Sequence, residues 1–189
     1  MNFAEYNVKD ANLEEVLLAL KSLDTVEAVA LGGSRSTGAS DENSDYDIYV
    51  YCAEIPTAET RENLLGKYCS IAEFGNHYWE SEDNTVMNNG VPVDIIYREV
   101  DRFGRYIDTV IKGGKAFNGY TTAFWHNIKN SKVLFDKTGT FTKFRDMAQI
   151  DFPENLRSAI IKNNRNLLNG KLPSYDRQIK KAQERGDIV

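Results

Sequence analysis

The chain has 189 residues and a net charge of −5, with 41% hydrophobic and 27% charged residues. This composition is ordinary for a globular protein with one domain and the start of a second. It excludes a membrane-spanning segment, because no apolar run approaches the roughly 20 residues that cross a bilayer. Met1–Asp10 lacks a secretory pattern, and Cys52 and Cys69 form no disulfide framework, so we expect a cytoplasmic protein.

The charge is distributed unevenly along the chain. Residues 1–152 carry 15 Lys/Arg against 24 Asp/Glu, whereas residues 153–189 carry 8 against 4. The acidic body argues against a nucleic-acid partner, which needs an extended basic surface. The basic tail faces either an anionic substrate or the acidic body, and docking on the body is the favoured interpretation.

The N-terminal third predicts a helix, a strand and a small-residue turn. Leu13, Val16, Leu17, Leu20 and Leu23 follow helical spacing, and Asn12 with Glu15 resembles a capping box. A strand over 26–31 then ends in Gly32-Gly33-Ser34-Arg35-Ser36-Thr37-Gly38.

This turn is suited to binding phosphate. Without bulky side chains at Gly33, backbone N–H groups can approach phosphate oxygens. Ser34 adds a hydroxyl donor and Arg35 a forked cation that fits phosphate geometry. The spacing therefore predicts a phosphate site immediately before the next strand.

Residues 45–51 alternate as a strand with one polar face. Asp45 and Asp47 point the same way, roughly 6.5–7 Å apart along the backbone. A second strand over 91–97 carries Asp94 among apolar residues, where an unpaired charge would be costly. Hard cations prefer oxygen ligands, so a metal shared by the three carboxylates is the economical interpretation.

Between these strands, Pro56-Thr57 begins a predicted helix that runs to Tyr68. The aromatic stretch from Phe74 to Trp79 is either a packed strand, which we favour, or a surface that stacks a base.

From Arg98 onward the pattern is mainly helical, with a short strand over 132–136. Asp151 and Pro153 open one helix, which ends at Asn169-Gly170, and Ser174 caps a last helix that runs to Gly186. We expect an α+β fold with a mixed twisted sheet flanked by helices. Residues 1–115 would form the domain that carries the three carboxylates, and residues 116–189 a mainly helical segment, an incomplete domain that binds a second substrate being one option.

Two motifs carry a resemblance to a known superfamily. Gly32-Gly33-Ser34-Arg35 followed by Ser44-Asp45-Tyr46-Asp47-Ile48 resembles the signature of the DNA polymerase beta-like nucleotidyltransferases. Val91-Pro92-Val93-Asp94-Ile95-Ile96 is similar to the strand that carries their third carboxylate. Within the superfamily, the chain looks like the small-molecule branch of aminoglycoside and lincosamide nucleotidyltransferases.

The resemblance implies a two-metal mechanism. Asp45 and Asp47 would ligate both Mg²⁺ ions, and Asp94 would join the acceptor-side ion and could act as the general base. Residues near Glu73 or Glu80 are an open alternative for the base. Gly33, Ser34, Arg35 and Ser44 would bind the nucleotide.

We expect an enzyme that transfers a nucleoside monophosphate from an NTP, with ATP anticipated, to a hydroxyl of a small molecule. One alternative is nucleotidylation of a protein or a tRNA end, as in toxin–antitoxin systems. The other is an inactive nucleotide-binding module, which the complete set of three carboxylates disfavours. The sequence leaves open the acceptor, the base preference and the oligomeric state, a homodimer being one option.

Overall fold

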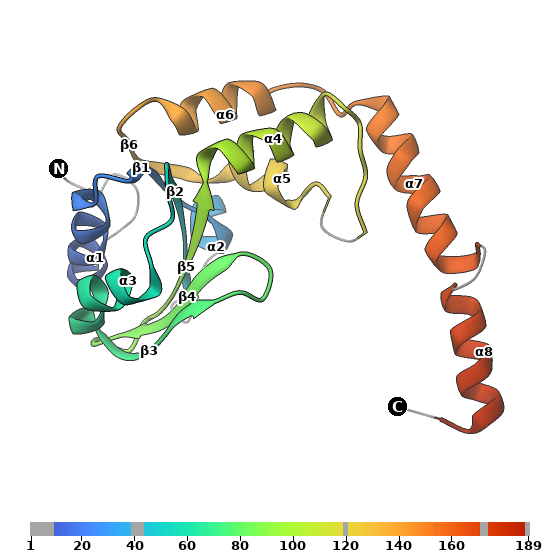
Figure 1. Ribbon diagram of the computed structural model, residues 1–189, viewed down its shortest axis with the longest axis horizontal. Coiled ribbons are helices and arrows are strands. Elements are labelled where there is room, and N and C mark those ends of the chain that lie inside the picture. Colours follow the sequence, from blue (N-terminus) through green and yellow to red (C-terminus); the bar gives the residue numbers. More distant parts are fainter. Residues whose placement is uncertain (1–9, 39–43, 119–120, 171–173, 188–189) are drawn as a thin grey trace. The chain divides into compact units, whose positions relative to one another are not determined.

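In the computed structural model, six strands form one mixed sheet among the residues that are described, which are 10–38, 44–118, 121–170 and 174–187. The strand order is β3-β4-β5-β2-β1-β6. The central neighbours β2 and β5 run parallel, and every other neighbouring pair is antiparallel. The predicted α+β fold with a mixed sheet and flanking helices is confirmed (Figure 1).

The elements in chain order are α1 (Ala11–Ser22), β1 (Val26–Leu31), α2 (Gly33–Thr37), β2 (Tyr46–Cys52), α3 (Ala58–Leu65), the 3₁₀ turn η2 (Gly66–Tyr68), β3 (Cys69–Asn76), β4 (Ser81–Met87), β5 (Pro92–Glu99), α4 (Val100–Ile111), α5 (Ala123–Asn130), β6 (Lys132–Asp136), α6 (Thr140–Ala148), α7 (Glu154–Asn169) and α8 (Tyr175–Arg185).

The chain divides into two compact units. The first contains the sheet and comprises residues up to Arg105 together with Trp125–Gln149. The second comprises Tyr106–Phe124 and Ile150–Val189. The division predicted from the sequence, at residues 115 and 116, stays a prediction.

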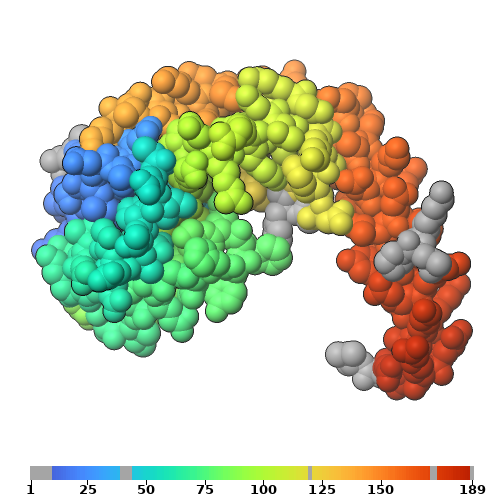
Figure 2. All heavy atoms as spheres, in the orientation of Figure 1, coloured from blue at the N-terminus to red at the C-terminus, as the bar shows by residue number. Residues whose placement is uncertain are grey.

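The core of the first unit lies between the sheet and helices α1 and α3. Alternation in β2 places Ile48 and Val50 on this face, where α1 contributes its apolar stripe, including Leu13 and Leu17. In the space-filling view, α1 and α3 lie beside each other on the surface above this core (Figure 2). The opposite face of the sheet is therefore left for other contacts.

Part of that opposite face is covered by aromatic side chains. Tyr51 of β2 meets Phe103 of α4 and Phe141 of α6 edge-on, with ring centroids 5.4 and 5.2 Å apart. These rings bury one end of the face. The other end of β2, where Asp45 and Asp47 lie, has polar neighbours instead.

In the second unit, Tyr106 stacks on Phe117 and meets Phe124 edge-on. Leu156 is the buried residue of α7, and Asn163 donates a hydrogen bond to the carbonyl of Ala116. No helix among the described residues is long and apolar enough to span a membrane.

Two sequence-based expectations about local structure were wrong. The N-cap of α1 is Asp10, whose carboxylate accepts from the backbone N–H groups of Asn12 and Leu13, so Asn12 does not start a capping box. The stretch 74–79 is not a packed strand throughout, because β3 ends at Asn76 and the Tyr78 and Trp79 side chains are 71% and 81% exposed. β3 is an edge strand and Tyr78 and Trp79 lie in the turn after it, so their rings are not buried against a helix or a second sheet in the described part of the chain.

Candidate active site

Three carboxylates lie at one end of the face opposite α1. Asp47 is the second residue of β2 and is half-buried, and Asp45 precedes the strand and is exposed. Strand alternation aims Asp47 away from the core that its neighbours Tyr46 and Ile48 enter.

Asp94 lies directly beside Asp47. β2 and β5 pair in parallel with Asp47 opposite Asp94, so the two backbones are about 4.8 Å apart at this point. The structure thus brings together all three predicted carboxylates, two on adjacent strands and one at the entrance to β2.

The electrostatics of this site favour a bound cation. Burial, together with the negative charges of Asp45 and Asp94, raises the pKa of Asp47 from its usual value of 3.8 to about 6. A divalent ion would relieve this repulsion, and oxygen ligands suit Mg²⁺, so the residues present fit the predicted metal. Among the residues that the structure describes, no three ligating groups are already gathered as tightly as a metal requires.

Asp94 has a positioning partner that the sequence analysis missed. Asn84 of β4 lies opposite Asp94 in register and donates a hydrogen bond of 2.9 Å to its Oδ1. Asn76 of β3 donates to Asn84 Oδ1 over 2.7 Å and to Glu73 over 3.3 Å. This amide chain orients one carboxylate oxygen and leaves the other for a ligand. In the sequence, Asn84 directly follows Asp83 in a segment that is too polar to be recognised as a strand, so no local signal pointed to its contact with Asp94.

The glycine turn packs directly against β2. Gly33 has a φ of +59°, and a Cβ built there would lie 1.7 Å from Asp47 Oδ2. A Cβ at Gly32 would lie 2.2 Å from the Tyr49 ring. The Gly32 N–H donates to the Asp47 carbonyl over 2.8 Å. Glycine is thus needed at both positions so that the turn can approach the carboxylate face.

The other predicted nucleotide-binding residues occupy the same end of the sheet. Ser34 lies in α2 and is half-buried. The Arg35 guanidinium donates to the carbonyls of Ser44 and Asp45 and lies over the Tyr46 ring, 4.1 Å from its centroid. In this arrangement Arg35 braces the start of β2, and its contact with phosphate stays a prediction.

Glu80, an alternative for the general base, is engaged elsewhere. Both of its oxygens accept from Arg98 over 2.8 Å, and the Arg98 guanidinium also donates to the Tyr51 hydroxyl. Arg98 is 3% exposed and lies over the ring of Tyr49 at 4.2 Å. These contacts give Glu80 a structural role.

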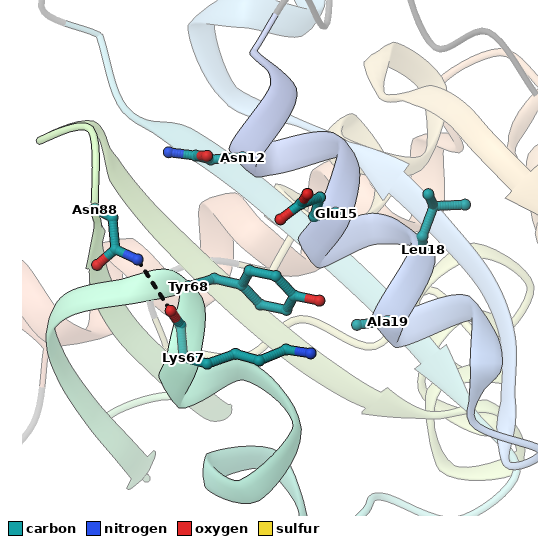
Figure 3. Close-up of a pocket in the computed structure, with 7 residues that line it drawn as sticks. All are labelled: Asn12, Glu15, Leu18, Ala19, Lys67, Tyr68 and Asn88. Atoms are coloured by element: carbon teal, nitrogen blue, oxygen red, sulfur yellow. Dashed lines mark hydrogen bonds between the residues drawn. The ribbon is translucent and has the colours of Figure 1, made fainter.

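A separate pocket of about 460 Å³ lies between α1 and η2 (Figure 3). Its lining includes Glu15, Leu18 and Tyr68, and Asn88 donates to the carbonyl of Lys67 at its edge. None of the predicted catalytic residues lines it, so it lies outside the candidate site.

A mixed sheet with carboxylates on adjacent parallel strands beside a glycine turn defines a nucleotidyltransferase fold. The family model of the nucleotidyltransferase domain matches residues 13–117, which is more than half of the chain. The chain belongs to this family and is a nucleotidyltransferase enzyme. No curated protein matches it significantly in sequence.

Several solved structures are similar in fold. The Cid1 poly(U) polymerase crystal structure is 18% identical with a TM-score of 0.40, and the match covers 60% of this chain and 38% of Cid1. A toxin–antitoxin structure with AMP-PNP is 14% identical with a TM-score of 0.41, over 91% of this chain and 97% of that one. Cid1 with the UTP analogue UMPNPP is 13% identical with a TM-score of 0.36, over 67% and 52%. The chain therefore spans about two fifths to one half of the Cid1 chains it matches.

Proposed function

We propose that the enzyme transfers a nucleoside monophosphate from an NTP to a hydroxyl group of a small-molecule acceptor and releases pyrophosphate. One observation carries the proposal. Asp47 and Asp94 lie opposite each other on parallel strands, and Gly33 packs against the Asp47 carboxylate. Carboxylates for metal and backbone for phosphate thus share one end of the sheet.

Asp45, Asp47 and Asp94 would hold two Mg²⁺ ions at this place. Bound Mg²⁺ supplies charge neutralisation for the leaving pyrophosphate and lowers the pKa of an acceptor hydroxyl. The raised pKa of Asp47 supports this assignment, because burial and, to a smaller extent, the charges of Asp45 and Asp94 disfavour its ionised form, which a bound cation would stabilise.

Asp94 is proposed to receive the proton of the acceptor hydroxyl. Its Oδ1 accepts a hydrogen bond from Asn84, which leaves its Oδ2 to contact the acceptor hydroxyl or a metal ion. Glu80 is less suited because both of its oxygens accept from Arg98. Glu73 has one weak partner, Asn76 at 3.3 Å, and stays the second candidate.

Gly33, Ser34, Arg35 and Ser44 are proposed to bind the nucleotide. The absence of a side chain at Gly33 would let the triphosphate pass close to the Asp47 carboxylate. Ser34 would donate its hydroxyl to a phosphate oxygen. Arg35 would keep its present contacts with the Ser44 and Asp45 carbonyls and so fix the strand entrance.

The negative charge of the first unit favours a small-molecule acceptor over a nucleic acid. Residues 1–105 carry 8 Lys/Arg against 20 Asp/Glu, so an extended phosphate backbone would be repelled along most of the first unit. ATP is the expected nucleotide.

The test is incubation with Mg²⁺, NTPs labelled at the α-phosphate, and separate pools of hydroxylated small molecules, tRNA and proteins. We expect label in a small molecule and an equal amount of pyrophosphate, neither of which forms with Asp47→Asn. Label in tRNA or protein would overturn the acceptor class. Binding of NTP with no transfer to any pool would overturn the proposed reaction.

A further inference from the structure

A basic pocket lies at the outer edge of the sheet, apart from the carboxylates. It has a volume of about 440 Å³ and is lined by Lys129, Ser131, Lys132, Val133 and Arg145. These residues come from the end of α5, the start of β6 and α6. Three cationic residues line the pocket, and none of its lining residues in the described part of the chain is a carboxylate.

The charge of this segment differs from that of the rest of its unit. Residues 125–149 carry 5 Lys/Arg against 2 Asp/Glu, whereas residues 1–105 carry 8 against 20. Cationic side chains that gather without carboxylates create a local positive electrostatic potential. On an otherwise acidic unit, such a potential attracts anions to this pocket.

Two lining side chains have the properties of a prepared site. The Arg145 guanidinium donates to the carbonyls of Ile128 and Ser131 and lies over the Phe141 ring, 4.9 Å from its centroid, so its charge is fixed in place. Ser131 is 4% exposed, and its hydroxyl oxygen is buried and has no hydrogen-bond partner among the residues that the structure describes. A buried hydroxyl without a partner is costly, and a ligand oxygen would satisfy it.

The pocket adjoins the glycine turn. Lys132 of β6 lies opposite Leu31, the last residue of β1 before the turn, and its ammonium group is 3.4 Å from the carbonyl oxygen of Arg35. In the sheet, β1 lies between β6 and β2, and β5 lies on the other side of β2. The pocket is therefore on the side of the carboxylates where the glycine turn lies, and Asp94 of β5 is on the other side.

We propose that this pocket binds a phosphate group. Lys129, Lys132 and Arg145 supply positive charges and Ser131 a neutral donor, a combination that suits the oxygens of a phosphate group. The phosphate belongs either to the outer end of the nucleotide or to a phosphorylated acceptor. The choice between these two sources rests on the proposed function, but the binding of a phosphate here does not.

The experiment uses inorganic pyrophosphate as the probe, without metal and at low ionic strength, with binding measured by calorimetry. The test variant is Lys129→Gln/Lys132→Gln, and the matched control is Lys137→Gln/Lys143→Gln, which removes two exposed cations of the same segment outside the pocket. We expect the test variant to bind about tenfold or more weakly and the control to change less than about twofold. Equal weakening in both pairs, or no weakening in the test variant, would overturn the proposal.

The source of the phosphate is assigned by a second titration with Mg²⁺ and a saturating non-hydrolysable ATP analogue. If the analogue displaces pyrophosphate and AMP does not, the pocket receives the outer phosphates of the nucleotide. If pyrophosphate binds beside the analogue, the pocket serves an acceptor phosphate. Asp47→Asn separates this proposal from the proposed function, because it should abolish Mg²⁺-dependent nucleotide binding and leave metal-free pyrophosphate binding intact.

Discussion

In the metal-free folded protein, the surroundings of Asp47 disfavour the ionised form of its carboxyl group. Its pKa is raised from 3.8 to about 6 by burial and by Asp45 and Asp94. The folded chain therefore holds this proton more tightly than the unfolded chain, and its contribution to stability falls as the pH rises from about 4 to about 6. At neutral pH the cost is fully present.

We therefore predict that Asp47→Asn stabilises the metal-free protein at pH 7 by about 1–2 kcal/mol, a value reduced from the full pKa shift because the group is partly exposed. Urea unfolding in the presence of a chelator measures the change. The gain should vanish below about pH 4, where the carboxyl is neutral in both states. A destabilised variant at pH 7 would show that Asp47 is a structural partner.

Gly33 and Gly38 form a matched pair for testing the turn. Both have positive φ angles, +59° and +79°, so alanine costs about 1 kcal/mol of backbone strain at either position. Only at Gly33 does the new Cβ meet Asp47 Oδ2, since a Cβ at Gly38 meets nothing within 4 Å. We expect Gly33→Ala to weaken Mg²⁺-dependent ATP binding about tenfold or more and Gly38→Ala to leave it within about twofold, measured by calorimetry. Similar losses in both variants would assign the effect to strain alone.

A substitution at Asp94 distinguishes nucleotide binding from nucleotidyl transfer. As the proposed base, Asp94 would act on the acceptor hydroxyl, whereas the nucleotide-side ion would be held largely by Asp45 and Asp47. Asp94→Asn should keep ATP affinity within a few-fold and lower pyrophosphate release by roughly 10² or more, the usual scale for a lost general base. Loss of ATP binding in a folded variant would instead place Asp94 on the nucleotide-side metal.

The positions of the three carboxylates in the sheet could be predicted from the sequence because strand alternation is a local property, whereas their catalytic role stays a prediction. Asp45 and Asp47 alternate with core residues, and Asp94 interrupts an apolar run. Asn84 could not be predicted, because its role depends on the register between β4 and β5, which no local pattern encodes.

At the scale of elements, β4 shows why part of the fold escaped prediction. Its residues Asp83 and Thr85 are buried although they are polar, since Asp83 pairs with Arg61 of α3 at 3.1 Å and Thr85 donates to the Val93 carbonyl. Arg61 lies in a helix and Val93 in the next strand, so the local hydropathy of β4 gives no strand signal. The short strand over 132–136 was predicted correctly because its apolar residues are consecutive in sequence.

The pairing of Arg98 with Glu80 ties β5 to the turn before β4. Glu80→Ala would leave the Arg98 guanidinium buried without its carboxylate, and we expect a loss of about 2–3 kcal/mol in urea unfolding, because an uncompensated buried charge is costly. Glu154→Ala is the control. It breaks an ion pair with Arg157 in which the two side chains are 78% and 57% exposed, and should change stability by no more than about 0.5 kcal/mol. Equal effects would mean that burial of Arg98 contributes little.

At the scale of the whole molecule, nucleotide binding should raise the thermal stability of the full chain. A ligand that binds only the folded state at about 100 times its Kd adds roughly 2.7 kcal/mol, or about 5–10 °C in Tm for a chain of this size. We expect this shift with MgATP in differential scanning calorimetry and its absence in Asp45→Asn/Asp47→Asn. A shift that survives in the double variant would place the nucleotide elsewhere.

The parallel pairing of β2 with β5 also bears on how the protein is made. Asp47 and Asp94 are register partners but lie 47 positions apart in the chain, with α3, β3 and β4 between them. At roughly 5–20 residues per second, a ribosome needs several seconds to add the second strand after the first. During this interval the nascent chain presents Asp45 and Asp47 without their neighbour, so the proposed catalytic centre is incomplete in a partly synthesised chain. Activity should therefore begin only after β5 has left the ribosome and paired.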